Sequence, residues 1–487
     1  MRARSHRSTA IRRASQPRPV AALFPDHRER GTWENLLTRE LIAADERIAD
    51  GAVTPVLDFA TFRRELAGFD FGAQRPLGEL LAWVIAQLEQ GVVHVTHPRY
   101  FGLFNPAPTF PAQCADRIAA AFNPQLATST TSPAAVEIEA HTIGAVARRA
   151  GLPPETTGHF TAGGAEANYT GLICALTRAN PEFSATGARA FAGPPVFYVS
   201  RESHLAWFKI AHQAGIGRNA VRLVATDGGG RMDTSALREA VTADRDAGCI
   251  PVMVAATAGT TNAGMIDPLA ACAQIAQSAG AWYHVDAAWG GALIASDTCR
   301  GELAGIEEAQ SVTIDAHKWF AATMGCGMFL TSDPSALSSA FQVSTGYMPS
   351  NVAGVDPYVT SVQWSRRFLG LRLFLSLAAA GWDGYARHVE RAIELAALLK
   401  ETLLARGWRV ANQSVLAVLC VEPPLGAVDA RTIVGRVLAT GQAWVSVANF
   451  EGRQVIRACL THGETTQDDV IGLVDALDRA RSPLWNG

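Results

Sequence analysis

The segment SVTIDAHKWF, residues 311–320, carries a run of β-branched residues that ends shortly before a lysine. Its first four residues have the composition of a buried strand in a parallel sheet. Lys318 would then lie just beyond the carboxyl end of that strand, where open α/β sheets bind their ligands. Taken alone, a His-Lys pair is better explained as a surface lysine beside a structural histidine, so a functional interpretation needs support from elsewhere in the chain.

Two upstream segments supply that support. The segment AWYHVDAAWGG, residues 281–291, places Asp286 at the end of another apolar strand, and TAGGAEAN, residues 161–168, is a glycine turn that opens a helix. Pyridoxal phosphate needs an amine for its Schiff base, a carboxylate facing its pyridine nitrogen and a helix N-terminus for its phosphate. The three segments provide these groups, so the pattern predicts a pyridoxal phosphate site built around Lys318.

Composition excludes several other classes of protein. The 487 residues are 48% hydrophobic and 18% charged, which is ordinary for a globular protein of more than one domain. A net charge of −3 offers no general attraction for nucleic acid or an anionic membrane, and no apolar run reaches the roughly 18 residues of a membrane span. The eight cysteines form no C-x-x-C pair, which argues against a zinc site and a disulfide framework. We therefore expect no metal, and a reducing, cytoplasmic location.

The order of the predicted elements suggests four parts. Residues 1–20 carry six arginines without an apolar core, so they resemble a disordered tail more than a secretory signal; an organelle transit peptide is the alternative. Residues 21–110 form an N-terminal helical segment, because residues 33–49 and 76–91 have helical spacing of apolar residues. We expect a large cofactor domain over residues 111–385 and a small α+β domain over residues 386–487.

Within the large part, short β-rich runs alternate with helical stretches. This alternation predicts an α/β fold with a mostly parallel sheet covered by helices. The expected strands are residues 195–200, 221–226, 250–257, 282–288, 311–316 and 327–332.

The chain resembles the group II pyridoxal phosphate-dependent amino acid decarboxylases, which include the aromatic L-amino acid and glutamate decarboxylases. The resemblance runs from about residue 90 to the end and implies the fold of type I pyridoxal phosphate enzymes. Its motifs occur in the order of that family. They are HPRYFG, SPAAVEIE, GGAEAN, SHLAWFK, ATAGTT, IDP, HVDAAWGG, DAHKW, SRRFLGL and IRACLTHGETT.

The resemblance implies roles for four residues on and around the cofactor ring. Lys318 matches the Schiff-base lysine, and Asp286 matches the carboxylate that keeps the pyridine nitrogen protonated, so that the ring can accept electrons when CO₂ leaves. His204 matches a histidine that stacks on the ring, and Ala288 matches the small residue on the opposite face.

Further matching residues are expected near the phosphate. Gly164 and Ala165 would present backbone N–H groups to it at the start of the helix, with His317 and Asp315 nearby. An ionised Asp315 would repel a phosphate, so it could instead orient the loop by accepting backbone hydrogen bonds. Thr257 matches a threonine close to cofactor and substrate, although it could equally satisfy a strand end.

Substrate choice is left open by the sequence. In residues 97–105 we expect Tyr100, Leu103 and Phe104 to bind substrate, and Leu103 stands where aromatic-specific relatives carry tyrosine and glutamate-specific ones glutamine. Leu103 favours an apolar pocket, and no cation is evident there to pair with a side-chain carboxylate. The segment 125–132 matches one that reaches into a neighbouring subunit's pocket, which implies a homodimer. An aromatic amino acid is favoured, with a bulky aliphatic one as competitor.

The product is predicted from Tyr347. It lies in residues 341–351, FQVSTGYMPSN, whose glycine, serine and proline content is typical of a mobile loop, and it matches a catalytic tyrosine of the decarboxylases. A tyrosine there can donate the proton that completes amine formation. Because the chain keeps both Tyr347 and His204, we expect amine and CO₂. An oxygen-dependent aldehyde synthase and a non-catalytic scaffold of the same fold remain as alternatives.

Overall fold

The computed structural model describes residues 22–343, 356–483 and 485. These residues divide into two compact units, the first made of the described residues up to 51 together with 55–93, and the second of 52–54 together with the described residues from 94 onward. The domain boundaries expected from the sequence at residues 110 and 385 stay predictions. Within the described residues, no helix is long and apolar enough to cross a bilayer.

The first unit is helical, as the apolar spacing predicts. Aspartates start two of its helices, because the Asp26 carboxylate accepts from the N–H of Glu29 and the Asp58 carboxylate from the N–H groups of residues 60 and 61. Arg47 pairs with Glu89 at 2.5 Å, which joins the first and third helices. The helices are α1 (His27–Asp50), α2 (Phe59–Ala67) and α3 (Leu77–Gly91).

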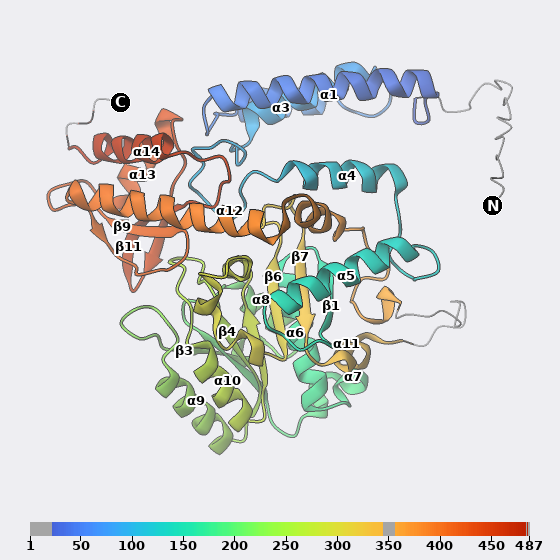
Figure 1. The fold of residues 1–487 in the computed structure, drawn as a ribbon, viewed down its shortest axis with the longest axis vertical. Helices are drawn as coiled ribbons and strands as arrows, with labels where there is room; N and C mark the ends of the chain where they lie inside the picture. Colours follow the sequence, from blue (N-terminus) through green and yellow to red (C-terminus); the bar gives the residue numbers. More distant parts are fainter. Residues whose placement is uncertain (1–21, 344–355, 484, 486–487) are drawn as a thin grey trace, which may run out of the picture. The chain divides into compact units, whose positions relative to one another are not determined.

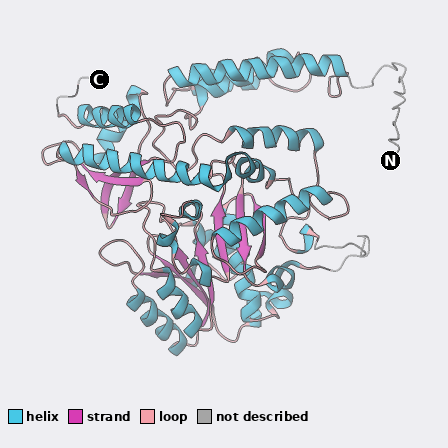
Figure 2. Cartoon of the chain, in the orientation of Figure 1, coloured by secondary structure: helices cyan, strands magenta, loops and turns pink. Residues whose placement is uncertain are grey.

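The second unit contains the predicted α/β sheet (Figures 1 and 2). Its seven strands lie in the order β1-β7-β6-β5-β4-β2-β3, and all neighbours are parallel except β7, which runs antiparallel to both β1 and β6. Every strand expected from the sequence is present, and β1 adds one that the sequence pattern did not indicate. The strands are β1 (Thr157–Thr161), β2 (Pro195–Ser200), β3 (Val221–Val224), β4 (Ile250–Thr257), β5 (Trp282–Asp286), β6 (Ser311–Asp315) and β7 (Gly327–Thr331).

Helices cover both faces of this sheet, because successive side chains of a strand point to opposite faces. In β2, Val196 and Tyr198 join the core beneath α5, α9 and α10, whereas Phe197 and Val199 join the core beneath α6, α8 and α11. These helices are α5 (Pro133–Arg149), α6 (Gly164–Ala179), α8 (Ala206–Gln213), α9 (Thr234–Asp246), α10 (Leu269–Ser278) and α11 (Pro334–Phe341). The unit also contains α4 (Phe110–Phe122), α7 (Phe183–Thr186) and short 3₁₀ turns.

The C-terminal part is α+β, as predicted. Its four strands form an antiparallel sheet in the order β10-β11-β9-β8. The long helix α12 (Leu371–Ala405) leads into it and is bent at Gly381, whose φ of +65° is a conformation that favours glycine. The strands are β8 (Arg409–Val410), β9 (Val418–Glu422), β10 (Ser446–Phe450) and β11 (Arg453–Cys459), and the helices are α13 (Ala430–Thr440) and α14 (Gln467–Ala480).

Candidate functional site

Three parallel strands bring their carboxyl ends together at one edge of the large sheet. Thr257 at the end of β4 lies directly opposite Asp286 at the end of β5, and Asp286 lies opposite Thr313 near the end of β6. Lys318 follows β6 in a tight turn, in which its N–H donates to the carbonyl of Asp315. The topology therefore places the lysine and the carboxylate of the sequence prediction at the same end of adjacent strands, where parallel sheets bind ligands.

The Lys318 side chain reaches back toward the strand end. Its Nζ lies 3.0 Å from Oδ2 of Asp315, whose side chain is only 2% exposed. The other oxygen of Asp315, Oδ1, is buried without a hydrogen-bond partner among the described residues. The Asp315 carboxylate thus pairs with the lysine amine, and no backbone N–H of the described residues donates to it.

Two hydrogen-bond donors of the protein interior orient the carboxylate of Asp286. Its side chain is buried, its Oδ2 accepts from Nδ2 of Asn168 at 2.8 Å, and its Oδ1 accepts from the N–H of Ala288 at 3.1 Å. A buried carboxylate with two oriented donors presents its remaining acceptor positions in fixed directions.

The start of α6 meets Asp315 at close range. A β-carbon added to Gly164 would lie 2.8 Å from Oδ2 of Asp315, so a side chain there would force the carboxylate to move. The first N–H groups of a helix have no acceptor within the helix, and they carry the positive end of its dipole. The α6 terminus at Gly164 and Ala165 is therefore suited to an anionic group.

Two residues from neighbouring strands complete this edge. His204 precedes α8, and its Nδ1 accepts from the N–H of Ala206 at 3.0 Å. Burial lowers the pKa of His204 and the charge of Lys318 acts in the same direction, while the charge of Asp286 raises it. The hydroxyl of Thr257 lies 2.8 Å from that of Ser203.

Behind Thr257 lies a buried carboxyl. Oδ2 of Asp267 accepts from the N–H of Thr257, and its Oδ1 accepts from the N–H of Met232, both at 2.8 Å. Burial raises the pKa of Asp267 to about 7, although these two hydrogen bonds oppose the shift. Asp267 thus holds the end of β4 in place from beneath.

One cavity joins these groups. Of the nine residues expected around the cofactor, eight line it, and only His317 does not. His317 is buried beside Cys326, its ring nitrogen Nδ1 lies 3.1 Å from the carbonyl of that residue, and its Nε2 lies 3.9 Å from Asp315. The eight lining residues are Gly164, Ala165, His204, Thr257, Asp286, Ala288, Asp315 and Lys318.

The residues expected to bind substrate are spread over different environments. Phe104 is buried and stacks on Trp289, which lines the cavity, with 4.3 Å between ring centroids. Tyr100 packs against Trp444, and its hydroxyl accepts from the N–H of Leu103. Leu103 itself is 46% exposed. Of the three, Phe104 stacks on a residue that lines the cavity, and Tyr347 lies outside the described residues.

The structure adds two residues that sequence reasoning did not single out. Asn168 lies four residues after Gly164 on α6, so both face the same side of the helix; this spacing was the available signal. Arg457 of β11 is buried, donates to the carbonyl of Thr261 at 2.6 Å and lies 5.4 Å from the ring centre of Phe104. Arg457 lies in the IRACLTHGETT motif but follows residues 97–105 by more than 350 positions, so spacing along the chain does not link it to that segment.

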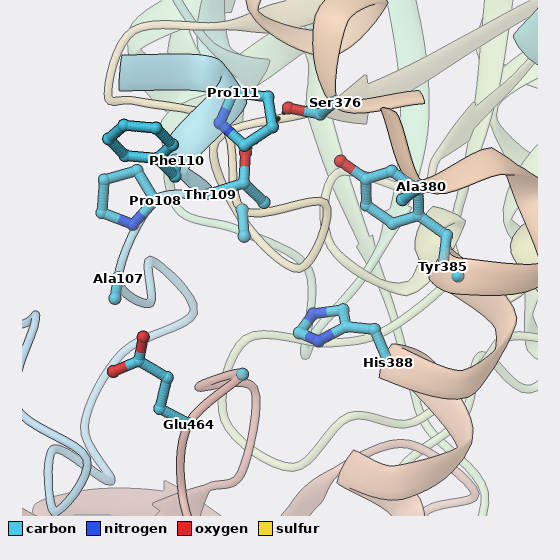
Figure 3. A pocket seen from close by; sticks show the side chains of 13 residues that line it. Ala107, Pro108, Thr109, Phe110, Pro111, Ser376, Ala380, Tyr385, His388 and Glu464 are labelled. Carbon is cyan, nitrogen blue, oxygen red and sulfur yellow. Dashed lines mark hydrogen bonds between the residues drawn. The ribbon is translucent and has the colours of Figure 1, made fainter. Parts of the chain in front are cut away.

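A larger cavity of about 330 Å³ is lined mainly by residues 107–111 and by α12, and none of these groups lines it (Figure 3). Two of its lining side chains, both from α12, hold the turn: the Tyr385 hydroxyl donates to the carbonyl of Phe320 at 3.1 Å, and His388 Nε2 lies 3.0 Å from the carbonyl of Trp319. Two side chains that line this cavity therefore support the turn that carries Lys318. The cavity itself shares no lining residue with the cavity at the strand ends.

The groups at the strand ends fit pyridoxal phosphate. The amine of Lys318 can attach to an aldehyde, the Asp286 carboxylate can accept from a protonated pyridine nitrogen, and the α6 terminus can receive a phosphate. The positive charge of Lys318 balances the negative charge of the Asp315 carboxylate, which would otherwise repel a phosphate at the start of α6.

Comparison with known proteins gives a consistent set of relatives. A family model described as the pyridoxal-dependent decarboxylase conserved domain matches residues 74–422. L-2,4-diaminobutyrate decarboxylase of Rhizobium meliloti (strain 1021) is 30% identical over 409 residues, which cover 82% of this chain and 80% of that protein. Tyrosine decarboxylase of Oryza sativa subsp. japonica is 31% identical over 368 residues, covering 72% and 68%.

Solved structures share the fold. Oryza sativa TDC with PLP and tryptamine superposes with a TM-score of 0.89 at 23% identity, over 97% of this chain and 100% of that one. Rhodiola rosea 4-hydroxyphenylacetaldehyde synthase superposes with a TM-score of 0.86 at 21% identity, over 95% and 100%. At these identities the likeness establishes the architecture alone.

Proposed function

We propose a reaction for this chain on one premise: the chain belongs to the family of pyridoxal-dependent decarboxylases. It is a carboxy-lyase whose cofactor is pyridoxal 5'-phosphate, as the resemblance implied. The reaction we propose is the decarboxylation of an L-amino acid to the corresponding amine and CO₂. The observation that carries it is the single cavity lined by Lys318, Asp286 and the start of α6.

Each of these groups has a proposed task. When bound, the cofactor supplies an electron-withdrawing ring that accepts the electron pair left behind by CO₂. Lys318 would hold the cofactor through its amine. The Asp286 carboxylate accepts a hydrogen bond from the ring nitrogen, and the first N–H groups of α6, at Gly164 and Ala165, receive the phosphate. His204 would stack on the cofactor ring, and the small side chain of Ala288 would leave room for it.

Three more of the expected cofactor residues act from beside or behind these groups in our proposal. Thr257 contacts the cofactor or substrate through its hydroxyl. Asp315 keeps Lys318 oriented by their ion pair. His317 supports the turn from behind, because it faces Cys326 and does not line the cavity.

We propose an aromatic or bulky aliphatic side chain for the substrate. The support is the buried aromatic wall formed by Phe104 and Trp289, which can bury an apolar side chain. Arg457 lies beside this wall and pairs with no carboxylate among the described residues, which is costly for a buried cation. Arg457 is a cation that residues 97–105 by themselves did not reveal, so the expectation that no cation stands there is corrected, and either the α-carboxylate or a side-chain carboxylate of a substrate would supply the missing counter-charge. The relatives named above act on differing amino acids, so their names do not decide between substrates.

The experiment that tests this proposal incubates the purified protein with each of the twenty amino acids and measures amine, aldehyde and peroxide. We expect amine and CO₂ from an apolar amino acid, without peroxide. Aldehyde and peroxide in stoichiometric amounts would instead identify the oxygen-dependent reaction.

A second measurement separates an enzyme from a scaffold. Borohydride should fix the cofactor on the peptide that contains Lys318, and this mass increase should be absent in Lys318→Ala. A protein that takes up no cofactor under these conditions would contradict the proposed function.

A further inference from the structure

A row of buried side chains runs away from the cavity behind Asp286. Nδ2 of Asn168 lies 2.8 Å from Oδ2 of Asp286, and Oδ1 of the same amide lies 2.9 Å from Nε2 of His284. Nδ1 of His284 lies 2.7 Å from the hydroxyl of Ser311, which lies 2.8 Å from the indole Nε1 of Trp282. These five side chains join three adjacent elements of the fold, α6, β5 and β6, and none is more than 6% exposed.

The two ends of the row determine the direction of every hydrogen bond in it. The indole N–H of Trp282 can only donate, so the Ser311 oxygen accepts from it. The Ser311 hydroxyl then donates its own proton to Nδ1 of His284. Burial lowers the pKa of His284 to about 4, so the ring is neutral near neutral pH and carries its single proton on Nε2.

The proton on Nε2 then determines the orientation of the amide. Nε2–H of His284 donates to Oδ1 of Asn168, with the hydroxyl of Thr313 as a longer contact at 3.4 Å. The amide of Asn168 therefore turns its Nδ2–H₂ toward Asp286, whose carboxylate can only accept. With the opposite tautomer of His284, the amide would turn its oxygen toward the carboxylate and repel it.

The charged groups near Asp286 lie on the cavity side. His204, Lys318 and Asp315 line the cavity together with Asp286, and among the described residues Asp286 is the charged neighbour that acts on His284. The row behind Asp286 is buried, so its hydrogen bonds are shielded from solvent and polarise one another in one direction.

We propose that Trp282, Ser311, His284 and Asn168 are positioning residues that hold the Asp286 carboxylate in the orientation needed to accept from the cofactor's ring nitrogen. This inference rests on the proposed function, because it concerns the same carboxylate. It adds that the state of the ring nitrogen depends, through the tautomer of His284, on side chains that lie behind the carboxylate.

The test loads the apo protein with pyridoxal phosphate labelled with ¹⁵N in its ring and follows the nitrogen chemical shift as a function of pH. The variants are His284→Phe, which interrupts the row in its middle, and Ser311→Ala, a smaller change that leaves Nδ1 of His284 without its donor. In both, the apparent pKa of the ring nitrogen should fall by about one pH unit. The dissociation constant of the cofactor, measured by titration of the apo protein, should rise about tenfold.

A matched control is available in the same sheet. His159 of β1 is equally buried and has no hydrogen-bond partner among the described residues, so His159→Phe makes the same substitution without breaking a row. It should leave the nitrogen shift and the dissociation constant unchanged. If His284→Phe and Ser311→Ala change these two values no more than His159→Phe does, the inference is wrong. If the unmodified protein binds no cofactor at all, the proposed function fails instead.

Discussion

Single residues at the strand ends depend on partners from distant parts of the chain. Asp286 receives its side-chain donor from Asn168, more than 100 residues earlier, and its backbone donor from Ala288. Lys318 finds its carboxylate partner only three residues away, in Asp315. The chemical role of each residue therefore combines a local turn with a long-range contact.

The first prediction concerns the carboxylate itself. Asp286→Ala should still take up the cofactor on Lys318, but the turnover number should fall by about a thousandfold or more, because the ring nitrogen loses its counter-charge. Single-turnover kinetics with a saturating substrate measures this step. Asp297→Ala removes an exposed aspartate of the same unit and should keep normal turnover. Near-normal turnover of Asp286→Ala would mean that another group faces the ring nitrogen.

The second prediction concerns Tyr347, which lies outside the described residues. Tyr347→Phe removes the hydroxyl that we expect to protonate the substrate carbon, so the product should shift from amine toward aldehyde, ammonia and peroxide. Oxygen consumption and product analysis under air measure the shift. Amine formation at the original rate would exclude Tyr347 as the proton donor.

At the scale of elements, the start of α6 closely approaches the side chain at the end of β6. Gly164 has no side chain, and the space that a β-carbon would take is occupied by the carboxylate of Asp315 at the end of β6. This approach lets the helix terminus and Lys318 face the same cavity.

The third prediction follows from this approach. Gly164→Ala should weaken cofactor binding about tenfold, because the new methyl group displaces Asp315 and crowds the helix terminus. Titration of the apo protein with pyridoxal phosphate measures the dissociation constant. Gly472→Ala in α14 is the control: its β-carbon meets nothing within 4 Å, so it should leave cofactor binding unchanged and stabilise its helix by about 1 kcal/mol. Equal affinities of the two variants would contradict the assignment of α6.

For the whole molecule, two hydrophobic cores on opposite faces of one sheet enclose several histidines. Burial lowers the pKa of His159 to about 3 and that of His284 to about 4, with Arg366 adding to the effect on His159. A buried neutral histidine links the stability of the fold to pH, because the unfolded chain can bind a proton that the folded chain resists.

The fourth prediction uses this link. The unfolded pKa of histidine is about 6.5, so His159 makes its full contribution above that pH and loses it as the pH falls toward about 3. Over this window the free energy of unfolding should fall more steeply in the unmodified protein than in His159→Phe, by up to about 1.4 kcal/mol per pH unit. Denaturant unfolding of both proteins across this pH window measures the difference between their free energies of unfolding. The other titrating groups are the same in both proteins, so their contributions cancel in that difference. Parallel curves would contradict the prediction, because they would show that His159 binds a proton as readily in the folded chain as in the unfolded one.

The fifth prediction is a homodimer with shared active sites. It rests on the resemblance of residues 125–132 to a segment that enters the neighbouring subunit's pocket and on the helical N-terminal region. Light scattering at micromolar concentration should give twice the mass of one chain, and activity should fall on dilution below the dissociation constant. A monomer that is fully active would contradict this prediction.

The amino-acid sequence was sufficient to predict the class of fold and the groups that meet at the strand ends. Alternating β-rich and helical runs predict a parallel, helix-covered sheet, and such a sheet collects the ends of β4, β5 and β6 at one edge. The positions of Lys318 and Asp286 at two of these ends therefore follow from the sequence pattern. The hydrophobic period of a segment is a local property, so a local pattern is enough to predict whether the segment is a strand or a helix.

Only the packing of the folded chain determines which side chains support these groups. Three features depend on how distant elements pack. Asn168 forms hydrogen bonds with Asp286 and His284, Arg457 lies near Phe104, and His317 does not line the cavity. The same holds for β1, which the pattern did not indicate, and for the reversed direction of β7. Sequence spacing carries no signal for such contacts, because they arise only when burial forces each polar group to find a partner among whatever neighbours the packing supplies.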